Sequence, residues 1–371
     1  MIFVENLLDV LNKNKISFFT GVPDSVLKNL SIHLDKYNNN KHQIAVNEGS
    51  AVAIGIGHYL ATKKLACVYM QNSGLGNAIN PLISIAHKKI YSIPMILLIG
   101  WRGAPDLKDE PQHMVKGKIT PRLLKLLNID FCKIKETKDL KKLDNLIKKA
   151  TKTKKVVACL VQNAVLKNKK KIAIIQNKKK NYFTSREIFL TNLLNTIKKD
   201  TKIISTTGHT SRELMKVRIE KNLKKGKDFY MVGGMGHSLS VAIGMSLKSK
   251  KQIICLDGDG SLLMHMGSAF TNGQTKKINL KHILLNNNSH ESVGGQVTGA
   301  EKINFNLLSK SLGYKNYFRI SNDQEIINIL KKFLNNKKTS LLEVLTKSEI
   351  KKNLPRPKNL IKIRDSFLSS I

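Results

Sequence analysis

Two apolar runs, each ended by polar turn residues, decide the fold of this 371-residue chain. The first is Ile253-Ile254-Cys255-Leu256, followed by Asp257-Gly258-Asp259-Gly260-Ser261. The second is His282-Ile283-Leu284-Leu285, followed by Asn286-Asn287-Asn288. Short apolar runs stopped by turn residues are typical of buried strands. The spacing of 28 positions from Asp259 to Asn287 leaves room for one crossover helix, so it predicts two neighbouring parallel strands.

Both polar ends would lie at the carboxyl edge of this sheet, where open α/β sheets bind ligands. The Asp259 carboxylate and the Asn287 amide oxygen would meet there as hard oxygen donors. Such donors suit a Mg²⁺ ion that also holds a phosphate. Each segment alone is also typical of an ordinary turn or loop. Their combination at this spacing is what favours a binding site.

The composition fits a globular protein of ordinary kind. With 41% hydrophobic residues, the chain is long enough for two domains with their own cores. Its four cysteines are scattered without metal-ligand spacing, which is typical of free thiols in a cytoplasmic protein. The N-terminus lacks the basic region of a signal peptide, and no apolar stretch is long enough to span a membrane. We therefore expect a cytoplasmic protein with no membrane partner.

The formal net charge of +38 would suit nucleic-acid binding. The lysines, however, are spread along the chain, aromatic residues are 6% of it, and no zinc-finger or RNA-binding signature is present. We therefore expect no specific nucleic-acid partner, although a positive field helps to capture anionic small molecules. A non-catalytic basic binding protein is the alternative from a different functional class.

Strand-like runs alternate with helix-like segments, which is typical of an α/β protein with parallel sheets. A lysine-dense segment at residues 167–183 is the best linker candidate. It separates residues 1–166 from residues 184–371, where Thr184 and Glu187 fit a capping box for the next helix. The predicted strands are residues 64–70, 95–100, 156–161, 202–205, 252–256 and 282–285.

The two halves show a trace of internal repetition. Residues 50–55 (SAVAIG) lead through a small-residue helix to a strand that ends in Gln71-Asn72-Ser73-Gly74. Residues 240–244 (SVAIG) lead through a similar helix to the strand that ends in Asp257-Gly258-Asp259-Gly260. Small residues on one helix face allow close approach to a sheet. The pattern favours two domains of one topology over a chance similarity of two Ala/Gly-rich helices.

Two segments of the second half have the composition of ligand-binding loops. Residues 206–211 (TTGHTS) follow a predicted strand and offer hydroxyl and backbone N–H groups at a helix start. Such groups suit a phosphate, although the same residues fit an N-capping run. Residues 232–237 (VGGMGH) combine glycines, which let the backbone approach a ligand, with the bulky Met235.

The first half holds acidic and basic candidates in three loops. Glu48 opens an apolar helix, a position that the helix dipole also favours for an acid. Asp24 follows the predicted strand 16–20 and also fits a helix N-cap. His113 is a plausible acid–base group near neutral pH. Arg102 and Lys116 have the charge to pair with an anionic group.

These segments together resemble the thiamine diphosphate (ThDP) enzymes. Gly258-Asp259-Gly260 followed by Asn286-Asn287 is similar to the diphosphate–metal motif of that family. Within it, residues 258–268, 290–296, 21–25 and 109–113 resemble the phosphonopyruvate decarboxylases. The resemblance extends from about residue 3 to residue 350. The family at large carries a middle domain that this chain is too short to hold, as in phosphonopyruvate and sulfopyruvate decarboxylases.

The resemblance implies an α/β protein with two ThDP-fold domains, each a parallel sheet flanked by helices, and no middle domain. It implies ThDP and Mg²⁺ as cofactors, a pyrimidine-binding domain at residues 1–166, and a diphosphate-binding domain at residues 184–371. The implied metal ligands are Asp259, the Asn287 side chain and the Ser289 backbone carbonyl. The implied cofactor-binding residues are Thr207, Gly208, Thr210, Ser211, Gly233, Met235, Gly258, Asp259, Gly260, Ser261 and Asn287.

The resemblance also implies roles in catalysis. Glu48 would protonate the aminopyrimidine ring, and Met235 would hold the cofactor bent. Asp24 and His113 are the candidates for proton transfer with the substrate. ThDP itself would act as the electron sink. The substrate-binding candidates are Ser25, Arg102, Lys116 and His290.

The implied reaction is that of a carboxy-lyase, the conversion of 3-phosphonopyruvate to phosphonoacetaldehyde and CO₂ in phosphonate (2-aminoethylphosphonate-type) biosynthesis. Sulfopyruvate decarboxylase is the nearest alternative, and an acetolactate-type carboligase is disfavoured because those chains usually include the middle domain. Family active sites lie between subunits, which implies a homo-oligomer. Asn288 stands where relatives often have Gly, and we expect it to adopt left-handed geometry.

Overall fold

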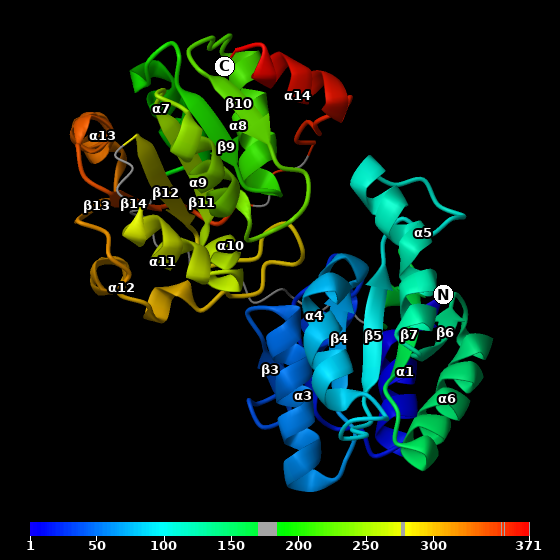
Figure 1. Ribbon diagram of the computed structural model, residues 1–371. Coiled ribbons are helices and arrows are strands. Elements are labelled where there is room, and N and C mark those ends of the chain that lie inside the picture. The colour runs from blue at the N-terminus through cyan, green and yellow to red at the C-terminus, as the bar shows by residue number, and fades with distance from the viewer. Residues whose placement is uncertain (170–183, 276–278, 350, 352, 371) are drawn as a thin grey trace. The chain divides into compact units, whose positions relative to one another are not determined.

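The computed structural model describes residues 1–169, 184–275, 279–349, 351 and 353–370 (Figure 1). The chain divides into two compact units. The first unit comprises residues 1–175 with 293–296, and the second comprises residues 176–292 with 297–371. Each unit is built on a six-stranded sheet in which all neighbouring strands are parallel.

In the first unit the strand order is β3-β2-β4-β5-β7-β6. The strands are β2 (Phe19–Gly21), β3 (His42–Ile44), β4 (Cys67–Gln71), β5 (Ile96–Trp101), β6 (Asp130–Ile134) and β7 (Val157–Gln162). The helices are α1 (Val4–Lys13), α2 (Lys28–Leu34), α3 (Glu48–Thr62), α4 (Leu75–Pro81), α5 (Pro111–Leu126) and α6 (Leu140–Thr153). A separate parallel pair joins β1 (Ile2–Phe3) to β8 (Leu166–Lys167).

In the second unit the strand order is β10-β9-β11-β12-β14-β13. The strands are β9 (Lys202–Ser205), β10 (Lys227–Tyr230), β11 (Ile253–Gly258), β12 (Leu280–Asn286), β13 (Asn316–Ile320) and β14 (Ser340–Leu345). The helices are α7 (Arg186–Thr196), α8 (His209–Glu220), α9 (Ser238–Lys248), α10 (Asp259–Met264), α11 (Gly267–Gln274), α12 (Phe305–Ser311), α13 (Ile326–Asn335) and α14 (Leu360–Leu368).

The two sheets have one topology. When the strands of each sheet are numbered in chain order, both read 2-1-3-4-6-5. This identity confirms the prediction, made from the repeated small-residue helices, that the two halves are domains of one kind. It also confirms the predicted α/β class with parallel sheets.

Each sheet is covered on both faces, so each unit has two hydrophobic clusters. The strands β7 and β12 are buried along their whole length, which explains why central strands read as continuous apolar runs. Helices α1, α6 and α13 are amphipathic instead. In α1 the residues Val4, Leu7, Leu8 and Leu11 are buried, at the spacing of one helix face.

The predicted strand pair of the opening motif is present. β11 and β12 are parallel neighbours, with Gly258 opposite Leu285, so both polar ends meet at one edge. The connection differs from the prediction, because two short helices, α10 and α11, replace one crossover helix. Asn288 adopts a φ of 54°, as expected for an asparagine at a left-handed position.

The predicted capping box at the start of α7 is wrong by one residue. The N-cap is Ser185, whose side chain accepts a hydrogen bond from the Ile188 N–H. Thr184 cannot serve as the cap because its backbone forms a parallel bridge with Thr346. The extended pairing therefore continues through Thr184 and the helix begins at Arg186.

The predicted linker at residues 167–183 lies mostly outside the described residues, which resume at Thr184 after Lys169. Among the described helices, none is both long enough and apolar enough to cross a membrane.

Candidate active site

The second unit contains an open pocket of about 550 Å³ at the carboxyl ends of β9, β11 and β12. The predicted site residues that line it are Thr207, Thr210, Met235, Gly258, Asp259, Gly260, Ser261, Asn287, Ser289 and His290. Thr206 and His209, from the predicted phosphate-binding segment 206–211, also line it, as do Arg186, Leu285, Glu291 and Ser292, which were not predicted as site residues. Three predicted cofactor residues, Gly208, Ser211 and Gly233, are not among the lining residues.

The Asp259 carboxylate lies at the floor of this pocket and is only 3% exposed. Its Oδ2 accepts a hydrogen bond of 2.5 Å from the Thr298 hydroxyl. Burial, together with the negative charge of Glu291, raises the pKa of Asp259 to about 6. Two carboxylates in one buried region repel each other, so a bound cation would stabilise both. The oxygen donors present here therefore fit a hard divalent cation.

The loop after β12 is shaped by its asparagine side chains. Asn286 is buried and donates a hydrogen bond of 2.7 Å to Glu343 on β14. Asn287 Oδ1 accepts a hydrogen bond of 3.0 Å from the Ser289 N–H. Asn286 thus anchors the loop to the sheet, while Asn287 and Ser289 line the pocket. Amide oxygens have two lone pairs, so Asn287 Oδ1 can still ligate a metal.

Residues 206–211, which lead from β9 into the first turn of α8, place some hydroxyl groups in the pocket and others in the interior. Thr207 and Thr210 line the pocket. The Ser211 hydroxyl instead donates to the Thr206 carbonyl at 2.7 Å and contacts the Ser205 hydroxyl at 2.8 Å. Ser211 therefore fixes the end of β9, and its predicted contact with a cofactor is not supported by its position. Gly208, the N-cap of α8, has a φ of 89°, which favours glycine.

Met235 and His290 approach each other over Gly260. A Cβ atom added to Gly260 would lie 2.8 Å from His290 Cε1 and 3.3 Å from Met235 Cε. Only glycine leaves room for both side chains at this point. Burial lowers the pKa of His290 to about 4, so its imidazole is neutral at pH 7. The position of Met235 inside the pocket fits the predicted role of an apolar wedge.

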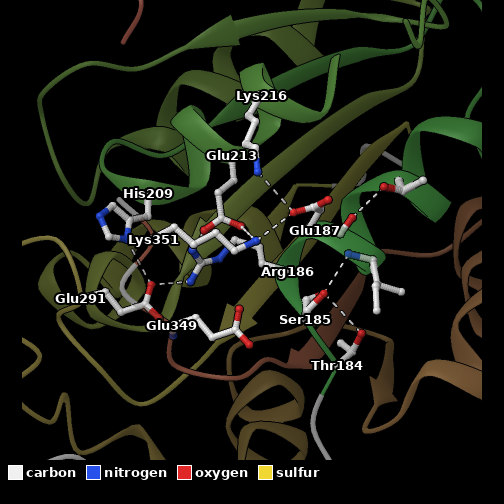
Figure 2. A network of polar contacts seen from close by, with 12 residues as sticks. Thr184, Ser185, Arg186, Glu187, His209, Glu213, Lys216, Glu291, Glu349 and Lys351 are labelled. Carbon is white, nitrogen blue, oxygen red and sulfur yellow. Dashed lines mark hydrogen bonds and ion pairs between the residues drawn. The ribbon is translucent and has the colours of Figure 1, made fainter. Parts of the chain in front are cut away.

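A network of ion pairs closes one side of the pocket (Figure 2). Arg186, the first residue of α7, contacts Glu213 on α8 at 2.6 Å and Glu291 in the loop after β12 at 2.6 Å. His209 Nδ1 lies 3.4 Å from the same Glu291 oxygen. Burial would raise the pKa of Glu291, but the Arg186 charge and the hydrogen bonds from His209, Arg186 and the Glu349 N–H together outweigh burial and hold this pKa at about 2. Glu291 is therefore a fixed anion within the pocket wall.

A second polar group, Cys255, Asp257 and His282, lies under the end of β11 and is fully buried. His282 Nδ1 is 2.7 Å from the Tyr314 hydroxyl, and its Nε2 is 3.6 Å from Asp257. The Ser238 hydroxyl at the start of α9 donates to Asp257 at 3.1 Å. These contacts join β11, β12 and α9, so we assign this group a structural role.

In the first unit, Glu48 occupies the first turn of α3 and is 5% exposed. Asn47 caps the helix by accepting a hydrogen bond from the Ser50 N–H. Glu48 Oε2 accepts a hydrogen bond of 2.8 Å from the Asn77 side chain. Its Oε1 occupies the space beside Gly74, where an added Cβ would lie at 2.1 Å. The carboxyl is thus held from one side and accommodated by a glycine on the other.

Asp24, which follows β2, is held in a similar way. It is 1% exposed, and its Oδ2 accepts a hydrogen bond of 3.1 Å from the Leu27 N–H. An added Cβ at Gly100 would lie 1.9 Å from Asp24 Oδ2. Burial raises the pKa of Asp24 to about 6, against the smaller opposing effects of backbone N–H groups and Arg102. Asp24 therefore holds the backbone just before α2, whose N-cap is Leu27 and not Asp24, and it is also able to exchange a proton near neutral pH.

Arg102 is engaged by neighbouring side chains. Its guanidinium forms a bidentate pair with Asp109, with contacts of 2.6 Å and 2.5 Å, and a hydrogen bond of 3.2 Å with the Ser25 hydroxyl. Asn72 accepts a hydrogen bond from the Arg102 backbone N–H at 3.2 Å. These contacts tie the loops after β2, β4 and β5 together. Arg102 is thus better placed to shape the loop than to serve as a free cation for a substrate.

Helix α5 carries two more of the predicted residues, His113 and Lys116. The His113 backbone passes close to Gly103, whose φ is 66°. Burial lowers the pKa of Lys116, and the charge of Glu48 acts in the opposite direction. Lys116 therefore lies within electrostatic range of Glu48, in a half-buried position, which suits a cation that binds an anionic ligand.

Two groups of residues were not predicted individually, and the reason differs between the groups. The asparagines Asn72 and Asn77 and the hydroxyl of Thr298 act through contacts with distant segments, and nothing in their local sequence marks them. His209 and Glu291 lie inside segments that the sequence did single out, residues 206–211 and 290–296. A charged residue within a ligand-binding motif is the signal that would have found them.

Comparisons with known proteins identify both units. Residues 1–121 match the family "Thiamine pyrophosphate enzyme, N-terminal TPP binding domain", and residues 207–344 match its "C-terminal TPP binding domain". Thiamine pyrophosphate is another name for ThDP. The chain is 31% identical to a phosphonopyruvate decarboxylase of Streptomyces viridochromogenes over 85% of this chain and 81% of that one.

Two further relatives are sulfopyruvate decarboxylases. One, from Methanosarcina acetivorans, is 28% identical over 92% of this chain and 91% of that one. The other is the alpha subunit of the Methanocaldococcus jannaschii protein, which is 36% identical over 37% of this chain and 79% of that subunit.

Proposed function

Because the chain belongs to the ThDP-dependent decarboxylases, in the group of the phosphonopyruvate and sulfopyruvate enzymes, we propose that its substrate is 3-phosphonopyruvate. The products are phosphonoacetaldehyde and CO₂, as in phosphonate (2-aminoethylphosphonate-type) biosynthesis. The observation that carries this choice is the 31% identity to a phosphonopyruvate decarboxylase over 329 residues. The enzyme is a carboxy-lyase that acts on a 2-oxo acid.

The second unit would hold the diphosphate and its metal. We propose Mg²⁺ bound by Asp259, the Asn287 side chain and the Ser289 carbonyl, with Thr207 and Thr210 directed at the diphosphate. The buried Asp259 carboxylate and its amide neighbour in one pocket support this choice. When bound, ThDP supplies the electron sink that accepts the electrons left by CO₂.

The first unit would supply proton transfer. The Glu48 carboxyl exchanges a proton with the aminopyrimidine ring, and Asn77 keeps that carboxyl in one orientation. Asp24, with its pKa near 6, exchanges a proton with the substrate. His113 is the second group proposed for proton transfer with the substrate. A general acid with a pKa near the working pH transfers protons most effectively.

The substrate anion needs cationic partners. We propose Lys116 for this role because it is half-buried within range of Glu48. Ser25 and the neutral His290 provide hydrogen bonds in the same proposal. Arg102 contributes through its hold on Ser25 and Asp109.

We further propose a cytoplasmic homo-oligomer. Its active sites combine the pyrimidine-binding domain (residues 1–166) of one subunit with the diphosphate-binding domain (residues 184–371) of another. Within each chain, the segment 167–183 is the proposed linker between the two domains. Some relatives are named as separate alpha and beta subunits of sulfopyruvate decarboxylase. Sedimentation analysis of the purified protein with and without ThDP and Mg²⁺ tests the assembly, and a monomeric active enzyme would contradict it.

A coupled decarboxylation assay tests the substrate. Aldehyde formation is measured with 3-phosphonopyruvate and with 3-sulfopyruvate, at equal concentration and with saturating ThDP and Mg²⁺. We expect a higher kcat/KM for 3-phosphonopyruvate. The opposite ranking would favour sulfopyruvate decarboxylase, the second candidate, which is supported by the 92% coverage of this chain in the Methanosarcina acetivorans comparison.

A further inference from the structure

We propose that Arg186 is a positioning residue for the diphosphate of ThDP, which it acts on through Glu291 and His209. This inference rests on the ThDP-binding part of the proposed function and is independent of the substrate. Arg186 lies at the start of α7, a helix outside the predicted ligand-binding segments.

Arg186 joins two separate walls of the pocket. One guanidinium nitrogen is 2.6 Å from Glu213 on α8, and the other is 2.6 Å from Glu291 in the loop that carries the metal-binding residues. All three side chains are at most 7% exposed. Because a guanidinium is planar and rigid, a bridge of this kind fixes the distance between its two carboxylate partners. The loop after β12 and the N-terminal part of α8 are therefore held at a fixed position relative to each other.

Glu291 is fixed in orientation by contacts on both oxygens. Oε2 faces Arg186, and Oε1 accepts a hydrogen bond of 2.6 Å from the Glu349 N–H. The carboxylate has no freedom to rotate without breaking one of these contacts. Its position is therefore set by the fold, not by the ligand.

Glu291 in turn orients His209. The imidazole Nδ1 is 3.4 Å from Glu291 Oε2 (Figure 2), and His209 is both the first residue of α8 and a lining residue of the pocket. A carboxylate beside one ring nitrogen sets the ring orientation and favours a proton on that nitrogen. Nε2 is then the ring atom left to contact a ligand, at a helix start that already favours anions.

Arg186 also neutralises the charge of Glu291. Glu291 lines a pocket that would receive a diphosphate, and two anions in one buried site repel each other. The Arg186 charge offsets that of Glu291 at 2.6 Å. The carboxylate can then orient His209 without repelling the ligand.

Calorimetric titration of the metal-supplemented, ThDP-free enzyme tests the proposal with three probes: ThDP, inorganic pyrophosphate and thiamine, each with Mg²⁺. In Arg186→Met we expect the Kd of ThDP and of pyrophosphate to rise at least tenfold, and that of thiamine to change less than twofold. Arg186→Lys keeps the charge but lacks the planar guanidinium that contacts two carboxylates at once, so we expect an intermediate rise in the Kd of ThDP and of pyrophosphate. Equal weakening of all three probes, or ThDP affinity within twofold of wild type, would overturn the proposal.

Two more variants separate positioning from charge. If Arg186 acted only by cancelling Glu291, then Glu291→Gln would bind pyrophosphate more tightly, and that result would refute the positioning role. We expect weaker binding, because His209 loses its partner. Glu291→Gln and Arg186→Lys also keep the test decisive if Arg186→Met does not fold.

The matched control is Arg218→Met. Arg218 forms a bidentate pair with Asp228 in the same unit, at 2.6 Å and 2.8 Å, and neither residue lines the pocket. Arg218→Met removes an arginine from the same domain whose side chain is 12% exposed, against 6% for Arg186. We expect the ratio of ThDP to thiamine affinity to stay at its wild-type value, and a fall equal to that in Arg186→Met would show a merely structural effect.

Discussion

Asp24 in the first unit and Glu291 in the second are both buried carboxylates at the edge of a parallel sheet, yet their pKa values shift in opposite directions. Burial raises the pKa of Asp24 to about 6. For Glu291 burial acts in the same sense, but the charge of Arg186 at 2.6 Å and the hydrogen bonds to this carboxylate together hold the pKa at about 2. In the first unit, Arg102 is paired with Asp109. Burial alone thus does not decide the charge of a carboxyl, because a paired arginine and hydrogen bonds can together outweigh it.

This difference matches the two tasks proposed for the units. In the proposal, carboxyl groups of the first unit exchange protons, and Gly74 and Gly100 leave room for them. The second unit is proposed to hold an anionic ligand, and the ion pairs of Arg186 with Glu213 and Glu291 stiffen its pocket. The following experiments test how far this contrast holds.

The largest effect is expected from Glu48→Gln. The amide keeps the hydrogen-bonding shape but has no proton to exchange, so turnover should fall by about 10²–10⁴-fold, the range of general acid–base catalysis. ThDP binding, measured by calorimetry, should be retained. Near-wild-type turnover would show that the first unit does not use this carboxyl in chemistry.

Removal of Arg186 from its ion pairs with Glu213 and Glu291 should lower the free energy of unfolding. In Arg186→Met the Glu291 carboxylate would keep the Glu349 N–H and the His209 imidazole beside it but lose its arginine, and loss of one partner from a buried ion pair costs about 3–5 kcal/mol. Urea denaturation measures the loss. Glu187→Gln, at a 30% exposed neighbour on α7 that pairs with Lys351, is the control and should cost less than about 1 kcal/mol. Equal losses in the two variants would remove the distinction.

Asp24 should make folding stability depend on pH. Its folded pKa of about 6 exceeds the ordinary value of 3.8, so the folded state binds more protons between these values. Its contribution is therefore fully present below pH 3.8 and is lost as pH rises through 6, by about 3 kcal/mol at most. Arg102 is the charged group that opposes this shift.

Asp24→Asn should remove that pH dependence, because an amide does not titrate. Denaturation midpoints of wild type and variant, compared between pH 4 and pH 8, measure the difference. Curves that stay parallel across this range would mean that Asp24 is ionised throughout, as Glu291 is.

The smallest effect is expected where a glycine makes room for a carboxyl. In Gly74→Ala the added Cβ would lie 2.1 Å from Glu48 Oε1, and such overpacking costs about 1–3 kcal/mol. Turnover should also fall, since Glu48 must move. Gly76→Ala is the matched control, because a Cβ there meets nothing within 4 Å and alanine favours a helix by about 0.5–1 kcal/mol. Similar melting temperatures for both variants would contradict the steric argument.

Local patterns were sufficient to predict much of the site. The apolar runs and their turn residues predicted β11, β12 and the meeting of Asp259 and Asn287, because parallel neighbours end at one edge. Glu48 was predicted to open an apolar helix, as it does, but its proposed role came from the family resemblance, because the helix dipole also favours an acid at that position. The Thr184 cap was misplaced because a bridge to Thr346, a distant residue, extends the strand-like segment by one position.

The α/β class, the repeated topology and the segments that line the pocket of the second unit could be predicted from the sequence, since each leaves a pattern of periodicity, repetition or turn residues along the chain. The pairing of charges could not, because it depends on the tertiary structure. Arg186 meets Glu213 and Glu291 from 27 and 105 positions away, and Gly100 makes room for Asp24 across the sheet. Charge state depends on distance and burial in three dimensions, and neither is encoded in the spacing of residues along the chain.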